Sequence, residues 1–274
     1  MSFPTVDALE RELRRLESKQ QISKRLEIPA YPVEFAMSVG ITPDPWQVEV
    51  LASDHPRKKI LCCGRQTGKS TVAAILAIHK ALTQPGSTVL VVAPGERQAK
   101  LLFSKALSLY RQAGYPLPAH SERRTGLEIS NGSVIEALPA VERTTRGYSV
   151  DLLVVDEAAG VPDMDYHGIL PALIATQGEQ VLLSTPRGKR GFFHELWHSA
   201  DDWMRVMVRS DEVDRIRPED LEVFRQTMPE AFFLQEFYCE WLETEGSLFS
   251  YDDIQAALAA GEDVAAIEVG DDEW

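Results

Sequence analysis

Residues 59–71 read KILCCGRQTGKST, and this stretch decides the fold. An apolar run ends at Cys63, a glycine-bearing loop follows, and a helix is expected to open at Lys69 and Ser70. Backbone N–H groups of such a loop, together with the positive end of the helix, bind phosphate. The residues expected to surround a triphosphate are Gly64, Gln66, Thr67, Gly68, Lys69, Ser70 and Thr71. The strict pattern has a glycine where Cys63 stands, so the interpretation of this loop as a phosphate site depends on a second motif elsewhere in the chain.

The second motif is DLLVVDE at residues 151–157. Residues 152–155 show no polar alternation, as in a parallel strand that is covered on both faces. Asp156 then emerges at the carboxyl end of the strand, where it is expected to hold Mg²⁺ through water, together with the Ser70 hydroxyl. Glu157 is expected to polarise the attacking water, and Lys69 to reach the β- and γ-phosphates. Taken alone, the two carboxylates would fit an acidic helix cap; paired with the first motif, they favour nucleotide hydrolysis.

Composition places few limits on function. The chain has 274 residues, 44% of them hydrophobic and 26% charged, which is ordinary for a globular protein. Its net charge is −14, but 13 of its 42 acidic residues follow Arg225, where lysine and arginine are absent. Residues 1–225 are therefore nearly neutral, with 28 basic against 29 acidic side chains, which neither supports nor excludes DNA binding. We expect the three cysteines to be buried and free, and the chain to have no membrane span.

Strand patterns alternate with helix patterns along the chain, which predicts an α/β fold with a mainly parallel sheet covered by helices on both faces. Prolines at 29, 32, 43 and 45 are expected to bound a short helix and a loop. The predicted helices cover residues 5–28, 33–39, 71–82, 98–113, 218–226 and 229–242, and the predicted strands cover 59–63, 88–94, 152–155 and 180–186, with a hairpin over 127–136. We expect an N-terminal helical segment at 1–40, an ATPase core at 41–245 and an acidic tail at 246–274.

An extra strand between the phosphate loop and the Asp-Glu strand fits the additional-strand class of P-loop ATPases. Within this class, the chain resembles the ATPase domain of the large terminase subunit, the DNA-packaging motor of tailed bacteriophages. The resemblance covers about residues 33–250 and includes the phosphate loop, which in that family often lacks its first glycine. Other matching segments are Trp46-Gln47, Arg146-Gly147, Ser184-Thr185-Pro186 and Phe237–Trp241.

The resemblance implies roles for several residues. Gln47 would hydrogen-bond adenine, and Arg65 would contact the γ-phosphate as hydrolysis proceeds. Ser184 and Thr185 would form the coupling motif, which relays loss of the γ-phosphate to movement. Taken alone, Gln47 also fits a helix start, Arg146-Gly147 a surface turn, and Ser184-Thr185 a strand end.

The resemblance further implies an ATP- and Mg²⁺-dependent motor that translocates double-stranded DNA into a capsid. Its partners would be portal protein and a small terminase subunit, in a homo-oligomeric ring docked transiently on a procapsid in the host cytoplasm. No nuclease activity is expected of this chain. Two alternatives stay open: a helicase or remodelling ATPase, and a nucleotide-binding scaffold without turnover.

Overall fold

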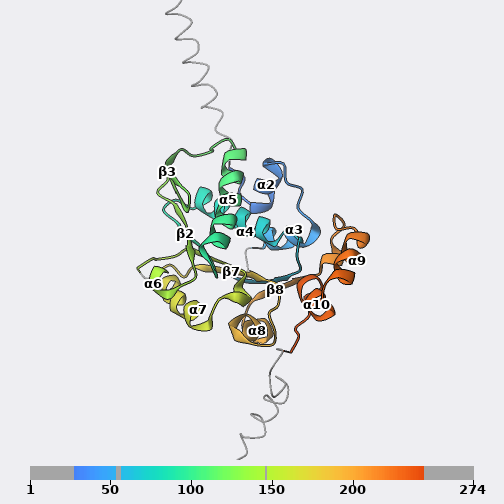
Figure 1. Ribbon diagram of the computed structural model, residues 1–274. Coiled ribbons are helices and arrows are strands. Elements are labelled where there is room, and N and C mark those ends of the chain that lie inside the picture. The colour runs from blue at the N-terminus through green and yellow to red at the C-terminus, as the bar shows by residue number, and fades with distance from the viewer. Residues whose placement is uncertain (1–27, 54–56, 146, 244–274) are drawn as a thin grey trace, which may run out of the picture.

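An eight-stranded sheet forms the centre of the protein, in the order β3-β4-β5-β2-β6-β7-β1-β8 (Figure 1). The computed structural model describes residues 28–53, 57–145 and 147–243. The strands are β1 (Lys58–Cys63), β2 (Thr88–Ala93), β3 (Ala119–Arg123), β4 (Gly126–Ile129), β5 (Val134–Pro139), β6 (Leu152–Asp156), β7 (Glu179–Ser184) and β8 (Met204–Val208). From β5 to β8 all neighbours are parallel, whereas β3, β4 and β5 pair antiparallel.

Strand β7 lies between β1, which leads into the phosphate loop, and β6, which ends at Asp156. This is the extra strand expected of the additional-strand class, and the α/β fold with a mainly parallel sheet is confirmed. Because β6, β7 and β1 are parallel, their carboxyl ends meet at one edge of the sheet.

Helices cover both faces of the sheet, because alternate strand residues point to opposite sides. In β1, Leu61 and Cys63 belong to one apolar cluster, and Ile60 and Cys62 to another. The first cluster is completed by α2 (Pro32–Ser38), α3 (Pro45–Ala52), α4 (Lys69–Thr83) and α5 (Glu96–Gln112). The second packs under α7 (Asp163–Ile169) and α8 (Gly191–His198), on the side of the sheet where α6 (Glu142–Thr145) also lies in Figure 1. Short 3₁₀ turns are η1 (Ala158–Gly160), η2 (Leu170–Leu173) and η3 (Ser210–Glu212).

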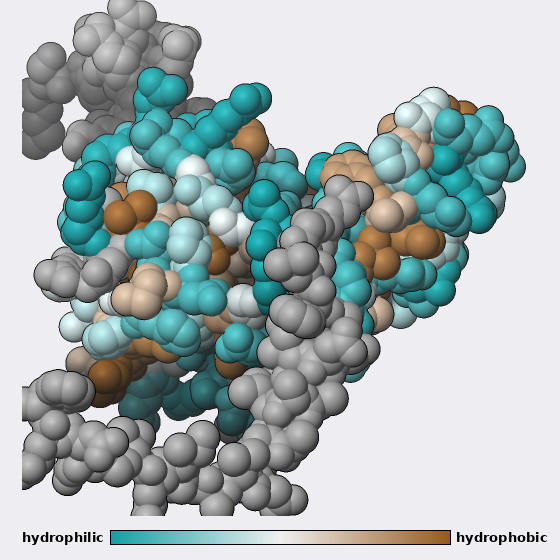
Figure 2. Space-filling model, turned by 60° about the horizontal axis from the view of Figure 1, so that its bottom comes forward, coloured by the Kyte–Doolittle hydropathy of each residue, from teal (hydrophilic) through white to brown (hydrophobic). Residues whose placement is uncertain are grey.

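Helices α9 (Pro218–Thr227) and α10 (Glu230–Tyr238) form a lobe beside the β8 edge (Figure 1). Leu221, Phe233 and Phe237 make a small core of their own there. Figure 2 shows hydrophobic atoms on the surface of this lobe. Val223, Phe224 and Phe232 are its exposed large hydrophobic side chains.

Several elements differ from the sequence prediction, and helices α6, α7 and α8 were not predicted at all. Pro45, expected in a loop, occupies the first turn of α3, where its missing N–H costs no hydrogen bond. Strand β3 was not predicted because its residues are mostly exposed and polar, and β8 was not predicted either. The other predicted helices and strands are present within a few residues of their expected bounds, apart from the helix over 5–28, which lies outside the described residues.

Two further observations bear on the expectations from composition. All three cysteines are buried and free. In the part of the chain that the structure describes, no helix combines the length and the apolar character needed to cross a membrane. The acidic tail at 246–274 lies outside the described residues, and the proposed domain bounds stay a prediction.

Candidate functional site

The phosphate loop connects β1 to α4 with the backbone geometry that its sequence indicates. Gly68, the residue before α4, has a left-handed φ of 95°, and Gln66 has a φ of 63°. A Cβ added to Gly68 would lie 2.6 Å from Nε2 of Gln47, so glycine is required at this position for two reasons. The Thr67 hydroxyl donates to the carbonyl oxygen of Gly64 at 2.8 Å, which closes the loop on itself.

Cys63 does not disturb this loop. It is the last residue of β1, it is buried, and it pairs in register with Val208 of β8. It is absent from the residues of positive φ, so a side chain is tolerated where the strict pattern has glycine. Burial raises the pKa of its thiol to about 12, and the thiol is therefore protonated and inert at neutral pH.

The end of β6 brings two carboxylates toward the loop. The ammonium of Lys69 lies 3.6 Å from Oε1 of Glu157. Glu157 adopts a left-handed conformation with φ 51° and ψ 44°, which is uncommon for a non-glycine residue and costs energy that the surrounding structure must supply. Its N–H donates to Oδ1 of Asp156 at 3.0 Å. The strained turn therefore directs the two adjacent carboxylates differently, with Asp156 buried and Glu157 exposed to solvent over 44% of its side chain.

Asp156 has an unusual electrostatic environment. Burial, and secondly the charge of Glu157, raise the pKa of its carboxyl to about 6, although Lys69 opposes the shift. A buried carboxylate that accepts a hydrogen bond from Glu157 has capacity left for a cation. Ser70, in the first turn of α4, adds a hydroxyl to the same edge. Hydroxyl and carboxylate oxygens are hard donors that suit Mg²⁺, so these residues fit the ion that the sequence predicts.

Ser184 is the last residue of β7, the strand between the two motif strands β1 and β6, and Thr185 directly follows it; both residues are buried. The Ser184 hydroxyl accepts a hydrogen bond from the N–H of Ala159, in the turn after Glu157, at 3.2 Å. The Thr185 hydroxyl lies 3.4 Å from Oε1 of Glu236 in α10. These two residues therefore connect the end of β6 to the α9–α10 lobe.

A cleft of about 510 Å³ opens over the phosphate loop. Seven of the predicted site residues line it or its floor, namely Gln47, Arg65, Gln66, Gly68, Lys69, Ser70 and Thr71. Gly64 and Thr67 are buried in the loop beneath, and Asp156, Glu157, Ser184 and Thr185 are not part of the lining. Gln47 has two contacts: Oε1 accepts the N–H of Asp44 at 2.9 Å, which caps α3, and the side-chain amide approaches Gly68. Its helix-start role is thus observed, whereas adenine binding stays a prediction.

Arg215 is a cleft residue that the sequence did not indicate. Its guanidinium donates to the carbonyl oxygens of Gln66, at 3.2 Å, and of Thr67, and it pairs with the carboxylate of Asp44. It reaches the loop from the segment after η3, well over a hundred residues along the chain. No local spacing signals such a contact. Lys105 of α5 also lines the cleft and was not predicted.

The Arg146-Gly147 segment, which also matched the family, is not placed in the cleft by the described residues. Arg146 lies outside the described residues, and the exposed Gly147 has a φ of 89°, as in a surface turn.

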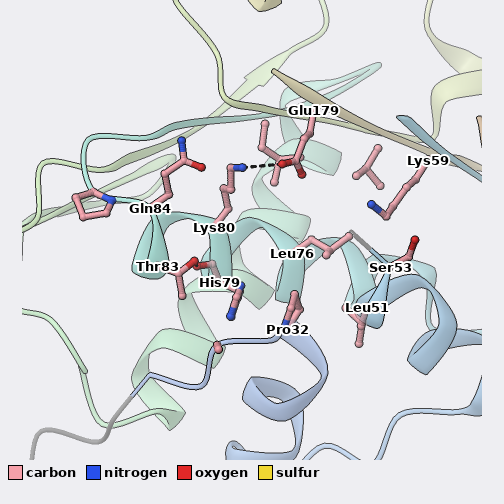
Figure 3. A pocket seen from close by; sticks show the side chains of 14 residues that line it. Pro32, Leu51, Ser53, Lys59, Leu76, His79, Lys80, Thr83, Gln84 and Glu179 are labelled. Atoms are coloured by element: carbon pink, nitrogen blue, oxygen red, sulfur yellow. Dashed lines mark hydrogen bonds and ion pairs between the residues drawn. The ribbon is translucent and has the colours of Figure 1, made fainter. Parts of the chain in front are cut away.

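A second hollow, of about 480 Å³, lies at the opposite edge of the sheet (Figure 3). Lys80 points to Glu179 across it and pairs with that carboxylate at 2.7 Å. Lys59, near the start of β1, also lines it. The hollow adjoins the amino ends of β1 and β7 and the last turns of α4, whereas parallel sheets bind ligands at the carboxyl ends of strands. The cleft over the phosphate loop is therefore the candidate site.

Comparison with known proteins agrees with this architecture. Residues 60–256 match the family described as terminase large subunit, T4likevirus-type, N-terminal. The terminase large subunit of Escherichia phage T5 is 28% identical over 222 residues, which cover 77% of this chain and 50% of that protein. The terminase large subunit of Thermus virus P23-45 is 24% identical, over 79% of this chain and 52% of that protein.

Solved structures show the same fold. The ATPase domain of the large terminase of Thermus phage P74-26 superposes with a TM-score of 0.69 at 24% identity, covering 76% of this chain and 98% of that one. The large terminase of a second thermophilic bacteriophage, in complex with ADP, superposes with a TM-score of 0.63 at 13% identity, over 77% of this chain and 57% of that one. The present chain spans about half the length of the curated relatives it matches. Its matched residues cover most of the described structure, and the chain belongs to the terminase large subunit family of T4likevirus type, in its N-terminal part.

Proposed function

We propose that this chain is the ATP-hydrolysing motor part of a viral DNA-packaging enzyme. The observation that carries the proposal is the 3.6 Å approach of Lys69 to Glu157, which joins the phosphate loop to a carboxylate directly after β6. Membership of the terminase large subunit family supports the coupling of hydrolysis to movement of double-stranded DNA.

Each residue of the candidate site has its own role in the proposed hydrolysis of ATP. ATP lies over the loop, with N–H groups of residues 66–71 and the Lys69 ammonium on its phosphates and Gln47 at the base. Ser70 and Asp156 would hold Mg²⁺, and the bound ion would supply positive charge that offsets the β- and γ-phosphates. Glu157 orients and polarises the attacking water, and it can turn to that water because its pairing with Lys69 is loose and its side chain is half exposed. Arg65 stabilises charge as the bond to the γ-phosphate breaks.

Arg65 gives a test of the mechanism. An arginine that acts at the γ-phosphate can be worth about 10³- to 10⁵-fold in rate, so Arg65→Ala is expected to bind ATP and to turn it over very poorly. Turnover at the wild-type rate would remove Arg65 from the catalytic set. ATP hydrolysis by the wild-type protein, measured with and without Mg²⁺ and linear double-stranded DNA, tests the activity itself.

We further propose that the protein works as a ring of subunits, with portal protein and a small terminase subunit as partners, on a procapsid in the host cytoplasm. A forked duplex distinguishes the helicase alternative, because a helicase would unwind it and a translocase of double-stranded DNA would leave it base-paired. A scaffold would bind ATP without turnover in any assembly.

The expectation that this chain does not cut DNA stays a prediction, and incubation of plasmid with the protein and Mg²⁺ or Mn²⁺ tests it.

A further inference from the structure

Lys105 is a cation of the cleft that the mechanism above leaves without a role. It lines the same cleft as Lys69 and Ser70, but it belongs to α5 and not to the phosphate loop. Lys105 is exposed, whereas Leu102 and Leu109, three residues before it and four after it, are buried in the apolar core. It therefore leaves the helix at the border of the buried face, where the flexible stem lets its ammonium move within the cleft.

The charges around the cleft favour an anionic ligand. The described residues that line it include four cations and no carboxylate. Three of these cations have an acidic partner beyond the lining, namely Arg65 with Glu236, Lys69 with Glu157 and Arg215 with Asp44. Lys105 forms no ion pair with any residue that the structure describes. An unpaired cation is repelled by its like-charged neighbours, and binding of an anion relieves that repulsion.

The position of α5 indicates which part of a nucleotide Lys105 would meet. Helix α4 lies between α3 and α5: α3 contacts β8 at one edge of the sheet, whereas α5 contacts β2 and β5 toward the other (Figure 1). Gln47, the residue expected at the base, belongs to α3, so Gln47 and Lys105 border the cleft from opposite sides of α4. A nucleotide that extends from Gln47 across the first turn of α4 therefore carries its phosphates toward Lys105.

The surroundings of Asp156 support the same placement. Burial and the charge of Glu157 raise the pKa of the Asp156 carboxyl, and the positive charges of Lys69 and Lys105 oppose the rise. Lys105 is thus near enough to act on the end of β6 through its charge. Asp156 is the residue expected to hold Mg²⁺ at the β- and γ-phosphates, so the ammonium of Lys105 lies toward the phosphate end of the cleft, away from the base.

We propose that Lys105 is a further phosphate-binding residue of this site, and that its ammonium contacts the β- and γ-phosphates of ATP from the α5 side of the cleft. A lysine suits this role because it offers three N–H donors on a compact charge, and a flexible stem lets that charge follow the phosphates. The inference rests on the proposed binding of ATP, and adds to it a residue from outside the phosphate loop.

The test compares Lys105→Met with the matched control Lys100→Met, which makes the same substitution in the same helix. Lys100 pairs with Glu96 and does not line the cleft. Affinity for a fluorescent ATP analogue is expected to fall about 10-fold in Lys105→Met. This is the lower end for hydrogen bonds to a charged group, because the ammonium is solvated in the free protein. Lys100→Met should bind the analogue as wild type does, and Lys105→Arg, which keeps the charge, should recover most of the affinity.

Inorganic tripolyphosphate separates contact with phosphate from contact with the base or ribose. It carries the phosphates alone, so its competition against the fluorescent analogue should weaken by the same factor in Lys105→Met. The KM for ATP should rise with the loss of affinity while kcat stays within about twofold, because the contact is made before and during the reaction alike.

Several results would overturn the inference. Unchanged affinity of Lys105→Met for ATP and tripolyphosphate is one, and a loss for ATP without a loss for tripolyphosphate is another. An equal loss in Lys100→Met would attribute the effect to the helix and not to the ammonium. A loss confined to binding of linear double-stranded DNA would assign Lys105 to DNA instead.

Failure of this inference differs from failure of the proposed function. Wild-type ATP affinity in Lys105→Met, together with weakened affinity in Lys69→Ala, overturns only the role of Lys105. A wild-type protein that binds neither ATP nor tripolyphosphate overturns both. Thermal unfolding of each variant checks that it is folded, and because Lys105 is exposed, its replacement should leave Tm unchanged.

Discussion

The Lys69 ammonium lies 3.6 Å from the Glu157 carboxylate, although the two residues are far apart in the chain. Strand order produces this contact: β1 and β6 flank β7, and all three end at one edge of the sheet. At 3.6 Å the contact is longer than a strong hydrogen-bonded ion pair, so either group can exchange its partner for ATP or water at small cost.

The first prediction concerns Lys69. Lys69→Ala removes a charged donor to the phosphates, and charge-assisted hydrogen bonds are worth about 1.5–3 kcal/mol, so ATP affinity is expected to fall about 10- to 100-fold. Titration with a fluorescent ATP analogue measures this. Lys80→Ala, which disrupts the ion pair in the second hollow, is the matched control and should leave ATP affinity unchanged. Equal ATP affinity in Lys69→Ala and wild type would exclude the loop as the phosphate site.

The pKa of Asp156 gives a prediction about pH. Its folded-state pKa of about 6 lies above the ordinary value of 3.8, so the folded protein binds this proton more tightly than the unfolded chain does. This group therefore favours folding at low pH, and the benefit is lost as pH rises from about 4 through 6. Without Mg²⁺, Asp156→Asn should have a higher melting temperature than wild type at about pH 7.5.

The difference in melting temperature between Asp156→Asn and wild type should shrink as pH falls toward about 4. Mg²⁺ binding should show the opposite preference, because the ion requires the ionised carboxylate. The Mg²⁺ affinity of the ATP complex is thus expected to weaken below about pH 6 in wild type. A pH-independent difference in melting temperature would show that the carboxyl has an ordinary pKa.

Arg215 tests whether side-chain contacts to the backbone of the phosphate loop support ATP binding. Its charged guanidinium donates to the carbonyl oxygens of Gln66 and Thr67, and hydrogen bonds that involve a charged group are worth about 1.5–3 kcal/mol each. Arg215→Ala should therefore loosen the loop and reduce ATP affinity by about 10-fold or more. Because the arginine is 44% exposed, its ion pair with Asp44 adds little to global stability. Asp44→Asn, which keeps a good helix cap, removes only the charge and should bind ATP as wild type does; a drop of the same size in both variants would assign the effect to the ion pair instead.

Gly64 tests the packing of the lobe against the loop. A Cβ at Gly64 would lie 2.6 Å from both the carbonyl oxygen of Phe237 and the hydroxyl of Ser210, so Gly64→Ala must displace backbone. The expected loss is about 1–3 kcal/mol of unfolding free energy, read from urea denaturation. Gly95→Ala is the control, because its Cβ would meet only the mobile end of Gln98 and should cost far less. Equal stability of the two variants would mean that α10 does not press on the loop.

Local sequence motifs predicted the centre of this protein well. The loop at 64–71 and the apolar run ending at Asp156 are each recognisable from a few consecutive residues. These two patterns are sufficient to predict β1, helix α4 after the loop, and β6. The sheet with its extra strand follows from the alternation of strand and helix patterns. The strict motif requires a glycine at the position of Cys63. The structure shows that this position is a paired residue of β1, where glycine is not needed.

The contacts that complete the candidate site were beyond prediction because they are non-local. Arg215 and Glu236 approach the loop from segments near residues 210–240, and their own neighbours in sequence carry no motif for phosphate. Glu236 lies one residue before the segment 237–241 noted for its resemblance, yet only the packing of α10 reveals that its carboxylate meets Arg65. Strand β3 has four exposed residues, so hydrophobic patterning had nothing to detect there.

The measurement that tests the account most directly is release of phosphate from ATP by the wild-type protein and by Glu157→Gln, with Mg²⁺ and with or without linear double-stranded DNA. Loss of a general base costs about 10²- to 10⁴-fold, so we predict that DNA-stimulated hydrolysis in the wild type falls by this factor in Glu157→Gln while ATP affinity is retained. Hydrolysis by Glu157→Gln at the wild-type rate would contradict the central claim that Glu157 activates water at this site.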